Sequence, residues 1–251
     1  MTLNVLMTVY NESEFVEYAI RSCLPYVGNL VIVEGAYQET IKLGMSSRST
    51  DGTLEIIEKF RNDPKVSIIY ANENTDKDQR NVGLEAIKKL DPGGWLLIID
   101  GDEVYEMLTL KQAHLLSRAF ERTGKYAAYF TSMTFVNDFK HYTLQEFPRL
   151  FKLTSKCEFV NDNFMKWDHD ERWDSTYVTK IPHMKYFHYA FCKDTQRFEL
   201  KKKWWETRFG KPFDYGWKVG EDGKITDKNH RIYEFTGKHP EIMKGHRLYH
   251  E

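Results

Sequence analysis

The sequence has few cysteines and no long apolar run. Its 251 residues include only three cysteines, Cys23, Cys157 and Cys192. Their odd number and wide spacing fit neither a disulfide framework nor a zinc site. The longest apolar runs are about five residues, against the roughly 20 that a membrane-spanning helix needs. The first residues also lack the basic and apolar regions of a secretory signal. We therefore expect a cytoplasmic protein with at most peripheral membrane contact.

An excess of either charge is also missing. The formal net charge is -1, so no overall basic field draws the chain to nucleic acid or to anionic lipid. One local basic run, residues 201–205 (KKKWW), permits two interpretations. It is a helix with solvated lysines and buried aromatic rings, or an amphipathic element that meets anionic lipid. The first is favoured, because three lysines bind a membrane only weakly.

No glycine-rich loop follows the first apolar segment. The first glycine in the chain is Gly28, whereas a dehydrogenase needs its G-x-G-x-x-G directly after the first strand. A sugar-phosphate nucleotidyltransferase would also need a glycine-rich phosphate loop there. This absence excludes the dehydrogenase and leaves the nucleotidyltransferase as a weaker alternative.

Apolar segments alternate with helical patterns along the first half. Strands are predicted at residues 3–9, 30–33, 66–70 and 95–99, and one of the intervening helices at residues 76–90. Strands are also predicted at 126–135, 147–151 and 184–189, followed by a helix at 198–209. Apolar strands separated by helices are typical of a parallel sheet covered on both faces. We predict an α/β fold without a linker between its halves.

Polar residues follow the predicted strands of the first half. They are Asn11-Glu12, Glu34, residues 72–76 and Asp100-Gly-Asp102. Ligands of open α/β sheets bind beyond the carboxyl ends of the strands. The positions of these residues therefore predict a ligand site as well as a fold.

Asp100 and Asp102 are the strongest candidates for a metal site. Residues two apart in an extended segment point to the same side, so both carboxylates can face one cation. Gly101 between them permits close approach of a ligand. Oxygen ligands suit Mg²⁺ or Mn²⁺, and such ions bridge to substrate phosphates. A surface turn is the alternative, but the buried strand before Asp100 favours the metal site.

Several motifs occur in a recognisable order. They are residues 7–12 (MTVYNE), 49–53 (STDGT), 78–83 (DQRNVG), 100–103 (DGDE), 149–151 (RLF) and 236–240 (TGKHP). Their order and spacing resemble glycosyltransferase family 2, in particular bacterial enzymes that build surface polysaccharide or lipopolysaccharide. The resemblance covers most of residues 1–190. It implies a GT-A fold, which is a Rossmann-like, mixed and mostly parallel sheet flanked by helices in a single domain, residues 1–251.

The resemblance also divides the chain by role. Residues 1–105 would bind the nucleotide sugar, and residues 106–251 would bind the acceptor and end in a helical, loop-rich tail. The nucleotide pocket would be lined by Thr8, Val9, Asn11, Glu12 and Gly101. Glu34 stands where the family usually has an aspartate that holds the ribose or the base. Arg48 and Arg80 can each bind the diphosphate through a planar guanidinium.

The remaining roles are a third metal ligand and a catalytic base. His188 resembles the family's late histidine, which completes the metal site with Asp100 and Asp102. Inverting transfer needs a base that takes the acceptor proton. A His-Glu pair follows the Arg-Leu-Phe stretch in related enzymes, and Asp162 takes the acidic position here. Asp170 is the second candidate.

The predicted function is transfer of a sugar from a nucleoside-diphosphate sugar to an acceptor hydroxyl. The donor would be a UDP- or GDP-sugar, the acceptor a glycan or another hydroxyl compound, and the cofactor Mn²⁺ or Mg²⁺. We expect inversion at the anomeric carbon. A non-catalytic protein that binds carbohydrate or nucleotide sugar on the same scaffold is the other alternative.

Overall fold

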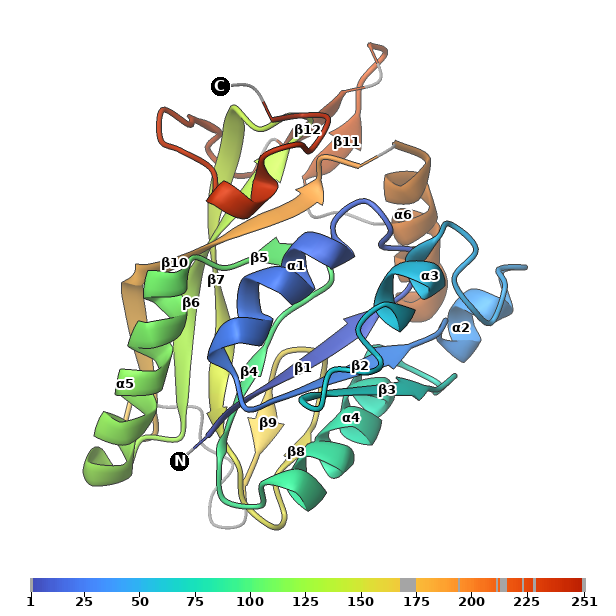
Figure 1. The fold of residues 1–251 in the computed structure, drawn as a ribbon. Helices are drawn as coiled ribbons and strands as arrows, with labels where there is room; N and C mark the ends of the chain where they lie inside the picture. Colours follow the sequence, from blue (N-terminus) through green and yellow to red (C-terminus); the bar gives the residue numbers. More distant parts are fainter. Residues whose placement is uncertain are drawn as a thin grey trace.

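A central mixed sheet organises the molecule (Figure 1). The computed structural model describes residues 2–167, 175–193, 195–210, 212, 216–222, 224–227 and 229–249. Within these ranges the sheet has nine strands in the order β3-β2-β1-β4-β7-β6-β10-β5, and β13 pairs with β7. The strands are β1 (Leu3–Val9), β2 (Asn29–Glu34), β3 (Val66–Tyr70), β4 (Trp95–Ile98), β5 (Glu103–Val104), β6 (Ala127–Val136), β7 (His141–Lys152), β10 (Val178–Phe191) and β13 (Tyr233–Glu234).

The directions of the strands confirm the predicted sheet. β1 pairs in parallel with β2 and β4, and β2 pairs in parallel with β3. Of the nine strands described, β5 and β7 run opposite to the other seven. The sheet is therefore mixed and mostly parallel, and it continues from the first half of the chain into the second.

Helices and two small hairpins complete the described elements. The helices are α1 (Val16–Cys23), α2 (Gln38–Ile41), α3 (Thr53–Glu58), α4 (Asp76–Leu90), α5 (Met107–Thr123) and α6 (Thr195–Phe209), with short 3₁₀ turns η1 (Leu24–Tyr26) and η2 (Glu241–Met243). Two hairpins lie outside the sheet: β8 (Glu158–Phe159) with β9 (Met165–Lys166), and β11 (Trp217–Val219) with β12 (Ile225–Asp227). No helix among the described residues has both the length and the apolar character to cross a bilayer.

The alternation of side chains along β1 explains why helices cover both faces of the sheet. Val5 and Met7 pack in one apolar cluster with residues of α1, α3 and α5. Leu6 points to the other face and packs with residues of α4 and of the β8–β9 hairpin. The two faces of β1 are buried because successive side chains of a strand alternate. The result is the predicted arrangement of a sheet between two helical layers.

Gly83 lets α4 lie close to the sheet. A Cβ atom at Gly83 would lie 2.2 Å from Leu6 Cδ1 and 2.8 Å from Val33 Cγ2. The helix begins after Thr75, whose hydroxyl accepts a hydrogen bond from the Asp78 amide at 3.3 Å. This cap and this contact fix the first turn of α4, which carries Arg80, beside the carboxyl ends of the strands.

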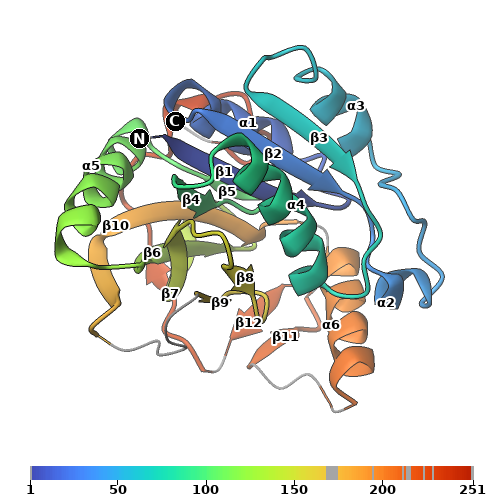
Figure 2. The same cartoon turned by 90° about the horizontal axis from the view of Figure 1, so that it is seen from below.

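Helix α6 lies beside α2 at one end of the sheet (Figures 1 and 2). The two helices are more than 150 residues apart in the chain, because α2 ends at Ile41 and α6 begins at Thr195. The predicted helix at 198–209 is confirmed as part of α6, and it packs against α2 in the segment that follows β2.

Candidate active site

A cavity of about 820 Å³ opens at the carboxyl ends of the parallel strands. It brings together most of the residues that the sequence predicted for the site. Those that line it are Thr8, Asn11, Glu12, Arg80, Asp100, Gly101, Asp102, Asp162 and His188. Such a position is expected, because ligands of α/β sheets bind at this edge.

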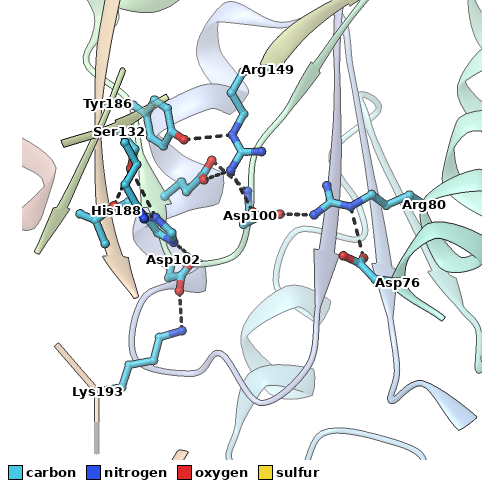
Figure 3. Close-up of polar contacts among 12 residues, drawn as sticks. Asp76, Arg80, Asp100, Asp102, Ser132, Arg149, Tyr186, His188 and Lys193 are labelled. Carbon is cyan, nitrogen blue, oxygen red and sulfur yellow. Dashed lines mark hydrogen bonds and ion pairs between the residues drawn. The ribbon is translucent and has the colours of Figure 1, made fainter. Parts of the chain in front are cut away.

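Asp100 lies between two buried arginines (Figure 3). Arg80 Nη2 is 2.8 Å from Asp100 Oδ1, and Arg149 Nη2 is 3.1 Å from Asp100 Oδ2. Arg80 also contacts Asp76, with 3.2 Å between Nε and Oδ1, and Tyr37 donates to the same carboxylate oxygen at 3.1 Å. Burial would raise the pKa of Asp100, but the two arginines lower it to about 2. Asp100 is therefore ionised at neutral pH.

Glu103 is the most deeply buried acid of this network. Its side chain is fully buried and contacts Arg149, which also donates to the Tyr186 hydroxyl at 3.2 Å (Figure 3). Burial raises the pKa of Glu103 to about 7, although Arg149 opposes that shift. Its other oxygen accepts from the Asp100 amide at 3.2 Å. Glu103 thus fixes the backbone at the start of the Asp-Gly-Asp motif.

Asp102 contacts two groups from β10 and the turn after it (Figure 3). His188 Nε2 is 3.4 Å from Asp102 Oδ1, and Lys193 Nζ is 2.6 Å from Oδ2. Burial would raise the pKa of Asp102, but Lys193 and His188 hold it well below its usual range. His188 comes to this place because β10 pairs with β5, where His188 lies opposite Glu103.

His188 has a second set of contacts on its other ring nitrogen. Nδ1 lies 3.4 Å from the hydroxyl oxygens of both Ser132 and Thr134, which β6 places beside it. Nε2 therefore points toward Asp102 and the cavity, as a metal ligand or a hydrogen-bond partner would. Over the part of the chain that the structure describes, no three His, Cys, Asp or Glu side chains converge as a metal-binding group.

Arg80 carries an unsatisfied donor. Its side chain is only 5% exposed, and Nη1 has no hydrogen-bond partner among the described residues. A buried guanidinium N–H without a partner costs free energy, because water no longer solvates it. The atom belongs to a residue that lines the cavity, so an anionic ligand there can supply the missing acceptor.

Gly101 allows the Asp-Gly-Asp segment to pack against the end of β1. A Cβ atom at this position would lie 3.1 Å from Glu12 Cγ and 3.1 Å from Val9 Cγ1. The close approach that Gly101 permits in this structure is that of Glu12 and Val9, whereas the close approach of a ligand stays a prediction. Asn11, just before Glu12, has a left-handed φ of 53°, which asparagine tolerates better than most residues.

Three predicted nucleotide-binding residues do not line the cavity. Val9 is buried in the apolar core. Glu34 is fully buried, and its Oε1 accepts from the Ser49 amide at 2.8 Å. Arg48 donates to the carbonyl oxygens of Glu34 and Ala71, at 3.4 and 3.1 Å. Glu34 and Arg48 hold the loop after β2 in place, because they bind its backbone and pair with each other, with 3.7 Å between Arg48 Nε and Glu34 Oε2.

The β8–β9 hairpin carries Asp162 to the cavity. Asn81, next to Arg80 in α4, donates to the Phe159 carbonyl at 3.0 Å and accepts from the Phe159 amide at 2.8 Å. This pair of hydrogen bonds attaches the hairpin to the first turns of α4. Asp170, the second candidate base, lies outside the described residues.

Aromatic residues of α6 form one wall of the cavity. Trp204 and Trp205, from the basic run at 201–205, line it together with Phe198. Trp204 also lies against Tyr37, with ring centroids 5.9 Å apart. The two tryptophans of this run are thus partly buried and line the cavity.

Lys193 and Arg149 are site residues whose roles were not predicted from the sequence. The sequence singled out Arg149 only as part of the motif at residues 149–151. The residues next to it in the chain give no indication that it contacts Asp100. Lys193 lies five residues after His188, where strict strand alternation would put it on the opposite face. A register shift between His188 and Phe191 breaks that alternation, and the turn after β10 directs Lys193 back to Asp102.

Fold and cavity together define an α/β protein with a cavity beyond the carboxyl ends of its parallel strands, where ligands of such sheets bind. The chain belongs to glycosyl transferase family 2, whose family model matches residues 4–187. The resemblance found in the sequence motifs is thereby confirmed, as is the α/β fold that it implied. No curated protein matches the chain at a significant level.

Solved structures with some likeness include TarS from S. aureus. TarS 1-349 is 23% identical over 53% of this chain and 36% of that chain, with a TM-score of 0.40. TarS 1-349 in complex with UDP-GlcNAc is 22% identical over 54% of this chain and 35% of that chain, with a TM-score of 0.40. Mannose-6-phosphate isomerase from Helicobacter pylori is 13% identical over 53% of this chain and 51% of that chain, with a TM-score of 0.34. The chain spans about a third of the length of the TarS 1-349 structures, at 36% and 35%.

Proposed function

We propose that the protein transfers a sugar from a nucleoside-diphosphate sugar, a UDP- or GDP-sugar, to a hydroxyl of a glycan acceptor. Family membership supports the reaction class. The unsatisfied Nη1 of Arg80 carries the assignment of the donor, because a diphosphate oxygen would satisfy it with a charge-assisted hydrogen bond. The cavity of about 820 Å³ also lies within the range typical of sites for small ligands.

We further propose that Mn²⁺ or Mg²⁺ takes part, held by Asp102 and His188 with Asp100 beside them. An ionised carboxylate is a donor that suits Mn²⁺ and Mg²⁺, and a histidine ring nitrogen is a common metal ligand. When bound, the ion neutralises the charge that develops on the leaving diphosphate.

The balance of charge in the site supports a requirement for an added cation. In the described part of the site, five carboxylates (Glu12, Asp76, Asp100, Asp102 and Glu103) contact three cationic side chains (Arg80, Arg149 and Lys193). With Glu103 protonated, four carboxylates face these three cations and the imidazole of His188, so the described contacts leave no surplus of positive charge for a diphosphate. A diphosphate brings further negative charge into this network, and a divalent ion offsets it.

Stabilisation by ligands tests the donor assignment. We expect UDP- or GDP-sugars to raise the melting temperature, more so with Mn²⁺, because a ligand of the folded state at 100 times its Kd adds about 2.7 kcal/mol. The measurement is a thermal-shift panel of nucleotide sugars with Mn²⁺ or with EDTA, followed by assays of hydrolysis and of transfer to glycans. No stabilisation by any nucleotide sugar would contradict the assignment. Binding without hydrolysis or transfer would instead indicate a non-catalytic binding protein.

Asp162 is the proposed base for transfer with inversion. Its carboxylate would take the acceptor proton while the acceptor oxygen attacks the anomeric carbon and the diphosphate leaves from the opposite side. Its position in the wall of the donor cavity, on a hairpin attached to α4, supports this role.

Asp162→Asn is expected to lower kcat by about 10² to 10⁴-fold, the usual contribution of a general base, with little change in donor Kd. The measurement is steady-state transfer together with calorimetric donor binding. Asn163→Ala, a change of the neighbouring cavity residue, is the control for a disturbed hairpin. If Asp162→Asn transfers sugar at a near-normal rate and binds donor normally, Asp162 is not the base, and Asp170 becomes the next candidate.

A further inference from the structure

Lys193 occupies a position between two carboxylates of the site. Its Nζ is 2.5 Å from Glu12 Oε2 and 2.6 Å from Asp102 Oδ2. The side chain of Lys193 is only 9% exposed. The three residues come from separate parts of the chain: Glu12 follows β1, Asp102 follows β4, and Lys193 follows β10. Their meeting is therefore a product of the fold and cannot result from local sequence.

The ammonium takes one of the two oxygens that Asp102 offers. His188 faces Oδ1, and Lys193 binds Oδ2 (Figure 3). A divalent ion on Asp102 would need this same region, beside the same histidine. A positive group 2.6 Å from the carboxylate opposes the approach of a second cation by direct repulsion.

We propose that Lys193 is a built-in counter-ion that competes with the divalent ion for Asp102 and is displaced when the ion binds. The inference rests on the proposed function and adds a way in which metal binding is controlled. Without metal, the ammonium neutralises Glu12 and Asp102, which would otherwise be adjacent uncompensated charges. When the ion takes Asp102, the lysine keeps Glu12 as a partner and its long side chain stays in the cavity, within reach of a bound diphosphate.

Metal affinity in the absence of nucleotide tests this competition. The variants are Lys193→Gln, which removes the charge, and Lys193→Arg, which keeps it. Lys152→Gln is the matched control, because Lys152 forms a part-buried pair with Glu121 at 2.9 Å away from the cavity. Binding of Mn²⁺ is followed by the electron paramagnetic resonance of the free ion.

We expect Lys193→Gln to bind Mn²⁺ about tenfold more tightly than the unchanged protein, since it removes a like charge beside the ligand. Lys193→Arg and Lys152→Gln should bind as the unchanged protein does. The melting temperature of Lys193→Gln should fall in EDTA and should rise more on addition of Mn²⁺ than that of the unchanged protein. Thermal melting also shows whether each variant is folded.

The outcomes separate this inference from the proposed function. Equal or weaker Mn²⁺ binding by folded Lys193→Gln overturns the competition alone. If no variant binds Mn²⁺ while transfer continues in EDTA, both the competition and the metal requirement are wrong. If Mn²⁺ binding tightens as expected but no nucleotide sugar is bound or consumed, the competition stands and the glycosyl transfer is wrong.

Discussion

Replacing Arg149 by methionine is expected to lower the free energy of unfolding by about 3–5 kcal/mol, the usual cost of leaving a buried charge without its partner. Arg149 is 2% exposed and holds Glu103, which is fully buried. Methionine keeps most of the apolar volume, so the loss reports the broken ion pairs. The measurement is urea denaturation at neutral pH. Arg149→Met with Glu103→Gln should recover part of the loss, because no unpaired carboxylate then remains at Glu103.

The effect should also depend on pH. Burial raises the pKa of Glu103 to about 7, so the folded protein favours its protonated form and loses stability as pH rises from about 4.5 through 7. Without Arg149 that pKa rises further. The loss caused by Arg149→Met is therefore expected to be larger at pH 8 than at pH 6. Equal losses at both values would contradict this account of Glu103.

Arg61 provides a matched control for Arg149. It too pairs with a glutamate, Glu58, and donates to a tyrosine hydroxyl, that of Tyr70 at 3.3 Å. The difference lies in exposure, since the side chain of Arg61 is 47% exposed and that of Arg149 is 3% exposed. Arg61→Met should change stability little, because exposed pairs are solvated and screened. A loss as large as that of Arg149→Met would show that burial is not the cause.

Replacing Arg80 by lysine is expected to weaken donor binding by about 10- to 100-fold. The reason is that a hydrogen bond to a charged group contributes about 1.5–3 kcal/mol and an ammonium cannot reproduce the planar fork. Nη2 of Arg80 binds Asp100, and Nη1 is left for the ligand. The single ammonium of a lysine could not bind Asp100 and the diphosphate with the geometry of the two guanidinium nitrogens. The measurement is calorimetric titration with UDP and with a UDP-sugar.

Arg48→Lys is the control that the fold itself supplies. The sequence offered Arg48 and Arg80 as equivalent diphosphate ligands, whereas the guanidinium of Arg48 is directed at backbone carbonyl oxygens. We expect Arg48→Lys to change stability but leave donor affinity within about twofold, since residues outside a site contribute little to it. A larger loss of affinity in Arg48→Lys than in Arg80→Lys would reverse the assignment.

Several elements of the first half of the chain could be predicted from sequence because their apolar residues follow the period of a strand or a helix over the whole element. β1, β3 and α4 begin and end at the predicted residues, since each has a continuous apolar run or a regular apolar face. Helix α5 was not predicted. It buries small or polar residues such as Thr109 and Ser117, while Leu108 and Leu115 are 62% and 63% exposed. Leu110, Ala113 and Phe120 do lie on the buried face, so the two exposed leucines blur an apolar stripe that would otherwise predict the helix.

The site could be predicted only where chemistry and position coincide in the chain. Asp100 and Asp102 follow a strong apolar strand, so their place at the sheet edge follows from local sequence. Contacts between residues far apart in the chain cannot be predicted from local sequence. Lys193, for example, reaches Asp102 through a register shift in β10. In the same way Glu34, at the end of β2, resembled a ligand for ribose, but Ser49 from the next loop binds it.

The attachment of the β8–β9 hairpin to α4 has a mechanical consequence. Asn81 holds both backbone groups of Phe159, and Arg80, the neighbouring residue, holds Asp100. Two adjacent residues of α4, Arg80 and Asn81, therefore connect the hairpin that carries Asp162 with the guanidinium that is proposed to bind the diphosphate. A shift of the first turn of α4 on donor binding would be transmitted directly to Asp162. The proposed diphosphate ligand and the proposed base thus share one support in α4 and do not depend on two independent loops.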